Sequence, residues 1–214
     1  MYKDGFLLLN FCSMHIDVSK LSGKYIYLEL LTPDHVETLR LLAKDERIWE
    51  FTKAFAINET FDQQFDDYIG TALNKNAMGG QQAFVIKQRA GNAIIGMTRF
   101  YEIQPKDKRA AIGYTWYIPA FWGKVHNKEC KFLMLAYLFE IAGFSRAEFH
   151  VAHQNIRSQK AVEKIGATRE GELRKYGFRN DGSVRNTVVF SIIDDEWPAR
   201  KENLLRLMAA IENR

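Results

Sequence analysis

The chain has 214 residues, of which 47% are hydrophobic and 13% aromatic, so it can bury the core of one sizeable domain. Its 30 Lys and Arg residues against 26 acidic residues give a net charge of +4, without the basic stripe that nucleic-acid binding requires. Cys12 and Cys130 stand far apart and outside any CxxC pattern, which excludes a disulfide framework and a zinc site. No apolar run approaches the roughly 20 residues of a membrane span, so we expect a soluble, cytoplasmic protein without a membrane partner.

The first 20 residues contain a short apolar stretch that Asn10 and Asp17 interrupt. No small-residue cleavage site follows it, which argues against a secretory signal peptide. We interpret residues 1–20 as a leader outside the core fold and expect a single domain over residues 21–214.

The downstream pattern alternates between helical and β periodicity. A β-rich stretch at 24–31 precedes Thr32-Pro33-Asp34, a typical helix start because Thr caps well and Pro suits the first helical position. Further strands are predicted at 83–87, 93–101, 109–117, 148–152, 167–178 and 184–193. Apolar residues three and four apart predict helices after Thr32, at 61–73, 127–142 and 158–165, and after Asp195. In the helix predicted at 127–142, Cys130 is interpreted as a small hydrophobic residue of the core.

A glycine-containing loop, residues 118–126, joins the strand at 109–117 to the next helix. Backbone N–H groups at a helix start are unpaired, and the helix dipole attracts a phosphate there. Lys124 and Lys128 add positive charge. By itself this feature fits either a phosphate site or an ordinary connecting loop.

Asn155-Ile156-Arg157-Ser158 follows one predicted strand and precedes a helix. In the simplest interpretation Asn155 or Ser158 caps that helix. The segment from Glu170 to Tyr176 fits a polar strand edge as well as it fits a surface that faces a substrate.

Residues 155–174 read N-I-R-S-Q-K-A-V-E-K-I-G-A-T-R-E-G-E-L-R, which resembles the signature N-x-R-S-x-x-A-x-x-K-x-G-(A/F)-x-x-E-G-x-L-R. That signature belongs to the ribosomal-protein N-terminal acetyltransferases, a branch of the GCN5-related N-acetyltransferase (GNAT) superfamily. Asp181-Gly182 and Glu196-Trp197 are also similar to the closing segment of the family. The resemblance implies the acyl-CoA N-acyltransferase fold of the α/β (α+β) class, a mixed, twisted sheet of about six to seven strands with helices on both faces.

The resemblance also implies acetyl-CoA as cosubstrate and no metal. In the superfamily the pantetheine arm lies between the fourth and fifth strands, here 109–117 and 148–152, and the pyrophosphate on the loop that follows the fourth. Asn155 would bond the pantetheine arm, and Arg157 would meet a phosphate or form an exposed ion pair. The implied cofactor-binding residues are Thr115, Trp116, Tyr117, Gly123, Lys124, Val125, His126, Asn127, Lys128, Asn155, Arg157 and Ser158.

Two places depart from the family pattern. Val125 and His126 occupy the region of the pyrophosphate loop where a second small residue is common. Ala111 stands where many relatives carry a Glu that acts as general base, directly before Ile112-Gly113-Tyr114.

Another group must therefore take the proton of the amine, since only a neutral amine attacks a thioester. The candidates for this base are Glu102, His150 and His153. Ser158 and Tyr114 are the candidates for protonating the departing sulfur, and a backbone N–H near 115–117 would stabilise the oxyanion.

The function implied is acetyl transfer from acetyl-CoA to a primary amine by direct attack, with a protein N-terminal amine as the acceptor of this branch. Two alternatives stay open: a small amine acceptor such as an amino sugar, polyamine or antibiotic, and a non-catalytic acyl-CoA-binding module, which Ala111 would explain. We expect a monomer or homodimer without a nucleic-acid partner. Acceptor choice would depend on residues 48–60 and on the hairpin near Asp181.

Overall fold

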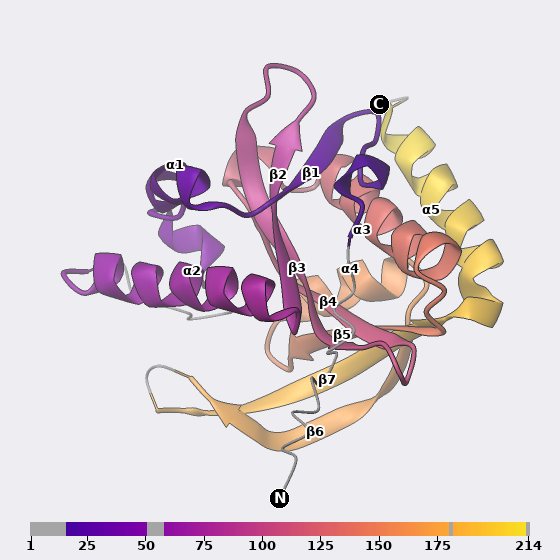
Figure 1. Cartoon of the computed structure of the whole chain (residues 1–214). Helices are drawn as coiled ribbons and strands as arrows, with labels where there is room; N and C mark the ends of the chain where they lie inside the picture. Colours follow the sequence, from indigo (N-terminus) through magenta and orange to yellow (C-terminus); the bar gives the residue numbers. More distant parts are fainter. Residues whose placement is uncertain (1–15, 51–57, 180–181, 213–214) are drawn as a thin grey trace, which may run out of the picture.

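The computed structural model describes residues 16–50, 58–179 and 182–212, and its strands form one seven-stranded sheet (Figure 1). The strand order is β1-β2-β3-β4-β5-β7-β6. The strands are β1 (Ile26–Leu30), β2 (Gln81–Gln88), β3 (Ile94–Gln104), β4 (Arg109–Tyr117), β5 (Arg146–Ala152), β6 (Thr168–Phe178) and β7 (Val184–Ile193). All neighbours are antiparallel except β4 and β5, which are parallel. The expected mixed sheet is confirmed.

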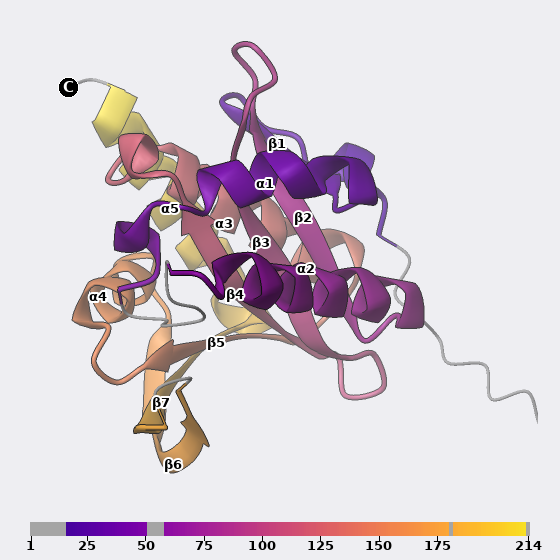
Figure 2. The same cartoon turned by 90° about the vertical axis from the view of Figure 1, so that its left-hand side faces the viewer.

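Helices cover both faces of this sheet (Figures 1 and 2). One face carries α1 and α2, and the other carries α3, α4 and α5. The helices are α1 (Val36–Leu42), α2 (Phe61–Met78), α3 (His126–Ala136), α4 (Ile156–Lys164) and α5 (Trp197–Glu212). Among the described residues, none of the helices has the length and apolar character needed to cross a bilayer.

Strand β2 shows why the sheet has two covered faces. Phe84 and Ile86 lie in the core beneath α3 and α5, whereas Ala83 and Val85 lie in the core beneath α1 and α2, and all four are fully buried. Successive side chains of a strand point to opposite faces, so a continuous apolar run fits a strand that is buried on both. The α1–α2 face is called the acceptor face below, and the α3 face the cofactor face.

Two helices end differently from their prediction. Helix α2 runs five residues beyond residue 73, to Met78, because Asn76 in its last turn accepts a hydrogen bond from the N–H of Ala83 at 2.8 Å and holds that turn to β2. The helix predicted over 127–142 divides into α3 and a π turn, Tyr137–Ile141, in which the N–H of Ala142 bonds the carbonyl of Tyr137 at 2.9 Å.

The prediction that residues 1–20 lie outside the fold is wrong for its last part. Ile16 is 8% exposed and belongs to the core beneath α3, and the N–H of Asp17 donates to the hydroxyl of Tyr137 at 3.0 Å. The apolar side chain of Ile16 and its place in the same core as the fully buried Leu21 explain this packing. The rest of the expected leader, residues 1–15, lies outside the described residues.

Glu129, in the first turn of α3, ties the start of β1 to the cofactor face. Its carboxylate accepts hydrogen bonds of 2.7–2.8 Å from the N–H groups of Lys24, Tyr25 and Ile26. A Cβ at Gly23 would lie 2.5 Å from the carboxyl carbon, so only glycine fits this approach. This contact fixes the position of α3 beneath the sheet, and α3 in turn positions the site described next.

Candidate active site

Strands β4 and β5 separate in the middle of the sheet. They pair at Arg109↔Arg146, Ala110↔Ala147 and Ala111↔Glu148, and no further pair follows although both strands continue through described residues. Beyond Ala111 and Glu148 the facing edges therefore present backbone N–H and C=O groups that do not pair with each other. Such edges can pair with an extended amide-containing chain. The expectation that these two strands splay apart is met.

A β-bulge lies in β4 beside this gap. Met97 pairs with Trp116 but Arg99 pairs with Gly113, so one residue of β3, Thr98, opposes both Tyr114 and Thr115. Tyr114 has a φ of +51°, which is unusual for a residue with a side chain. A bulge leaves backbone groups outside the ladder, and it redirects them at the point where the strands part.

Hydroxyl groups and a buried lysine hold the bulge. Thr98 and Thr115 share a hydrogen bond of 2.7 Å between their Oγ1 atoms, and Lys131 Nζ of α3 donates to Thr115 Oγ1 at 2.9 Å. The same Nζ lies 5.7 Å from the ring centroid of Phe149 on β5, so Lys131 spans the floor of the gap on the cofactor face. Burial lowers the pKa of Lys131. In the sequence it is only a lysine within an apolar helical stripe, which did not mark it as a site residue.

The start of α3 fits the predicted phosphate site. No side chain caps this helix, and Gly123 in the preceding loop has a φ of +73°, which a residue with a side chain adopts only with strain. The N–H groups of Lys128 and Glu129 already bond the carbonyl of Val125, so the donors left for an anion come from residues 123–127.

Side chains around this helix start divide into charged and packed groups. Arg157 of α4 stacks on Trp122 with its guanidinium carbon 4.6 Å from the ring centroid, and Lys124 lies 5.2 Å from the ring of Phe121. Burial and the nearby Lys164 lower the pKa of Lys128. Three cationic side chains thus border the loop, which suits a pyrophosphate.

Val125 and His126 can contribute to such a site only through their backbone. Both are 7% exposed, and the imidazole of His126 packs edge-on against Phe121, with ring centroids 4.7 Å apart, and against Tyr25. Burial, assisted by Lys124, lowers the pKa of His126, so this ring stays neutral near pH 7. These two departures from the family pattern fill the core beneath the loop.

Asn155 has the structural role that the simplest interpretation gave it. Its side-chain oxygen accepts a hydrogen bond from the N–H of Ser158 at 2.9 Å and caps α4. The amide nitrogen of the same side chain can donate to a ligand in the gap. Ser158 stands in the first turn of α4, directly after Arg157.

On the acceptor face, Glu148 supplies the carboxylate that Ala111 lacks. Ala111 pairs with Glu148 across the two strands, so the missing carboxylate has a neighbour one strand away. Glu148 Oε2 lies 2.9 Å from His150 Nε2, and Glu148 Oε1 accepts from Arg146 Nε at 2.8 Å. Burial alone would raise the pKa of Glu148, but the hydrogen bonds from Arg146 and His150 outweigh it and lower the pKa overall. The sequence did not single out Glu148.

Of the three residues proposed as base, the structure brings two together. His150 Nδ1 lies 4.0 Å from Glu102 Oε2, while Nε2 faces the ionised Glu148. His153 is elsewhere, with Nδ1 3.3 Å from the carbonyl of Asn186. The ligand atoms of Glu102, Glu148 and His150 lie within 4.8 Å of one another, as a metal would require, but hydrogen bonds to His150 and Arg146 already account for this arrangement.

Aromatic rings line the acceptor face around His150. Tyr101 packs edge-on against His150 and Tyr114 at centroid distances of 5.9 and 5.1 Å, and Tyr176 of β6 approaches His150 at 6.3 Å. A Cβ at Gly113 would lie 2.8 Å from Tyr101 Cε1, so the glycine lets this ring lie close over β4. Burial raises the pKa of Tyr101, which therefore stays protonated.

This arrangement, a mixed sheet whose parallel pair opens beside an uncapped helix start, defines the acyl-CoA N-acyltransferase fold. Residues 26–168 match the family described as acetyltransferase (GNAT) domain, and the chain belongs to that family.

Individual relatives agree with this assignment. The uncharacterized N-acetyltransferase YoaA of Bacillus subtilis (strain 168) is 33% identical over 108 residues, which span 50% of this chain and 60% of that protein. A crystal structure of a T. thermophilus protein with a provisional acetyltransferase name has 30% identity and a TM-score of 0.76, covering 88% of this chain and 96% of that one. A spermidine N-acetyltransferase from Vibrio cholerae, in complex with CoA and spermine, shares the fold at a TM-score of 0.64 and 20% identity, over 81% of this chain and 98% of that one.

Proposed function

We propose that the protein transfers the acetyl group of acetyl-CoA to a primary amine by direct attack of the amine on the thioester. The observation that carries this proposal is the gap between β4 and β5, with the bulge at Tyr114 on one edge and the uncapped start of α3 at its end. A non-catalytic binding module would not need the ordered pair of Glu148 and His150 on the opposite face of the same gap.

The cofactor face would hold acetyl-CoA. The N–H groups of residues 123–127, with Lys124 and Arg157, would bind the pyrophosphate. The pantetheine arm would pair with the free edges of β4 and β5, and the Asn155 amide would donate to it. This arrangement would bring the thioester beside the bulge, where a free backbone N–H of 115–117 would stabilise the developing oxyanion.

On the acceptor face, His150 would take the proton of the amine. The ionised Glu148 accepts from Nε2–H, which leaves Nδ1 of the neutral imidazole as the proton acceptor. Glu102, 4.0 Å from Nδ1, would stabilise the imidazolium that forms. The carboxylate next to the Ala111 position would therefore act through the histidine.

Ser158 is the proposed donor to the departing sulfur. Tyr114, the other candidate, turns its ring to the acceptor face, where it lies against Tyr101. Ser158 instead begins α4 at the end of the gap, in the turn that Asn155 caps.

We propose a small primary amine as the acceptor, because Tyr101, Tyr114 and Tyr176 wall the space around His150 closely. A protein N-terminal amine is the second candidate, and the observation that favours it is the signature over residues 155–174.

The test is release of free thiol from acetyl-CoA by the purified protein with a panel of small amines and of short peptides with free N-termini. Turnover with small amines that exceeds turnover with peptides supports the first acceptor class. The reverse preference supports the second. A folded protein that releases thiol with neither, and that does not bind acetyl-CoA, contradicts acetyl transfer.

A further inference from the structure

Arg99 of β3 is the largest fully buried side chain of the described residues, and it carries a charge. It is 2% exposed and lies beneath the acceptor face. Its guanidinium stands between two aromatic rings, with its carbon 4.3 Å from the centroid of Tyr68 on α2 and 4.5 Å from that of Tyr114 on the bulge. Aromatic faces satisfy the two flat sides of a guanidinium and leave its N–H edges free.

One edge of Arg99 has no acceptor among the described residues. Nε and Nη2 are both buried and unpaired, and these two atoms form an edge that can bind a carboxylate through two parallel hydrogen bonds. A native fold rarely leaves buried donors of a charged group unsatisfied, since the cost of desolvation is then not offset. The geometry therefore calls for an anionic partner at this edge.

A third unpaired donor belongs to the same neighbourhood. Trp116 Nε1 on β4 is buried without a partner in the described part of the chain, and its ring lies 5.5 Å from that of Trp49, which in turn lies 6.1 Å from Tyr68. Trp116 pairs with Met97, two residues before Arg99 on the same strand. Three buried N–H donors to which no described carboxylate or carbonyl bonds make this part of the acceptor face a place for an anion.

The position of Arg99 ties this place to the reaction centre. Arg99 pairs with Gly113, directly before the bulge, and the ring that stacks on it, Tyr114, is 49% exposed and also contacts Tyr101. His150 approaches Tyr101 from the other side. The amine end of an acceptor near His150 would thus find Arg99 farther along the same wall of tyrosines.

We propose that Arg99 binds the carboxylate of the acceptor through Nε and Nη2, so that the acceptor is a small amino carboxylate, such as a free amino acid. This inference rests on the acetyl transfer proposed above. The charges match at both ends: the ammonium group of a zwitterion faces Glu102 and Glu148, and its carboxylate faces Arg99. The phosphates of acetyl-CoA would bind on the opposite face of the sheet and would not compete for Arg99.

The test compares free amino acids with the same compounds as carboxamides in the thiol-release assay. We expect kcat/KM for the best amino acids to exceed that for their amides by about 10- to 100-fold, the contribution of a charge-assisted hydrogen-bonded pair. Arg99→Met should lower the value for the acids to that for the amides and leave the amides unchanged. Arg99→Lys, which keeps the charge but not the fork, should restore only part of the difference.

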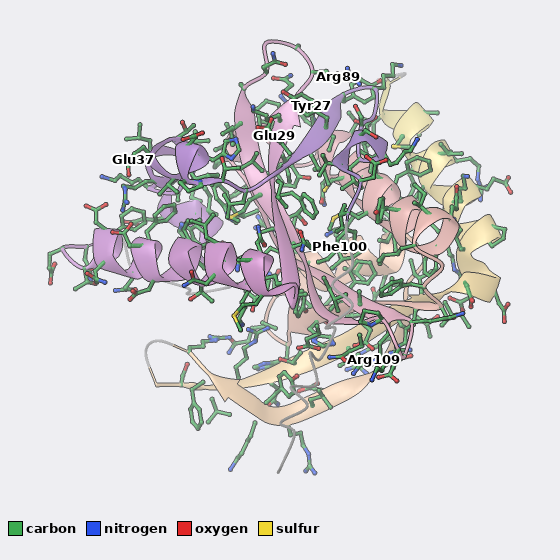
Figure 3. The ribbon with its side chains drawn as sticks, viewed as in Figure 1. Tyr27, Glu29, Glu37, Arg89, Phe100 and Arg109 are labelled. Atoms are coloured by element: carbon green, nitrogen blue, oxygen red, sulfur yellow. The ribbon has the colours of Figure 1, made fainter. Side chains whose placement is uncertain are left out.

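Arg89 provides the matched control. It is an exposed arginine that also lies over a tyrosine, Tyr27, 6.0 Å from its centroid, at the end of the sheet away from β6 and β7 (Figure 3). Arg89→Met should leave the discrimination between acids and amides intact.

Three results would overturn the proposal: equal turnover of acids and amides by the wild type, an equal loss for both in Arg99→Met, or turnover only of amines without a carboxylate. Thermal unfolding of the wild type with each amino acid and its amide is a second measurement, which needs no variant and no acetyl-CoA. A rise in melting temperature with the acids alone supports the site, and no rise with any acid contradicts it. Calorimetric binding of acetyl-CoA separates a failure of this inference, where binding persists, from a failure of the acetyl-transfer proposal, where it does not.

Discussion

The two sides of the gap between β4 and β5 are built in different ways. The cofactor face uses backbone groups and caps from two short stretches, residues 115–128 and 155–158. The acceptor face uses side chains from five elements, with Tyr68 on α2, Arg99 on β3, Tyr114 on β4, His150 on β5 and Tyr176 on β6. A site made of local backbone geometry can be recognised in a sequence, whereas a site assembled by sheet register cannot.

The largest expected effect belongs to the acceptor face. His150→Ala should lower kcat by about 10²- to 10⁴-fold because it removes the proposed proton acceptor. The affinity for acetyl-CoA should not change. Steady-state kinetics with calorimetry measures both.

His153→Ala is the control, since the His153 ring lies against the carbonyl of Asn186 and the variant should retain nearly full kcat. A similar loss in both variants would show that His150 is not the base. Glu148→Gln should fall between them, because it removes the negative charge that orients the imidazole and favours the imidazolium. For the same reason its activity should reach half its maximum at a lower pH than that of the wild type.

The next effect concerns the floor between the two faces. Burial lowers the pKa of Lys131, so between that value and the unfolded-state value of about 10.4 the unfolded chain binds a proton that the folded chain has lost. Wild-type stability should therefore rise with pH through this window. Lys131→Met should be more stable than the wild type at the low end of the window, by about 1–3 kcal/mol, and the difference should shrink toward the upper end.

Denaturant unfolding at several pH values measures this difference. Lys75→Met, on an exposed position of α2, is the control and should not change the slope with pH. A Lys131→Met variant that follows the wild-type pH dependence would contradict a depressed pKa for Lys131.

The smallest expected effect belongs to the cofactor face and separates the two roles of Asn155. Asn155→Ala removes both the cap of α4 and the amide donor, and should cost about 1 kcal/mol of stability as well as about tenfold in acetyl-CoA affinity. Asn155→Asp keeps an acceptor for the Ser158 N–H and should lose affinity with little loss of stability. Equal affinity of Asn155→Asp and the wild type would leave Asn155 with its capping role alone.

The fold itself followed from local signals. Strands β4 and β7 have the predicted bounds, 109–117 and 184–193, because polar turns and an Asp-Gly pair delimit them. The end of α2 was missed because a contact with β2, which a loop separates from it, stabilises its last polar turn. The turn residues 180 and 181 and most of the loop 48–60, both expected to influence acceptor choice, lie outside the described residues.

The site divides in the same way. Gly123 and Asn155 could be found from the loop and cap patterns around them. Glu148 could not, because only the register Ala111↔Glu148 shows that a carboxylate stands next to the position of the missing one. Arg99 leaves a fainter signal, one charged residue inside a strand that is otherwise largely apolar, and its meaning appears only when Tyr68 and Tyr114 enclose it.

The most direct measurement of the central claim is a calorimetric titration of acetyl-CoA into the wild type and into variants of each face. The account predicts one binding site per chain, weakened in Asn155→Asp and unchanged in His150→Ala and Arg99→Met. No binding by the folded wild type, or an equal loss from substitutions on both faces, would contradict the division of the gap into a cofactor side and an acceptor side.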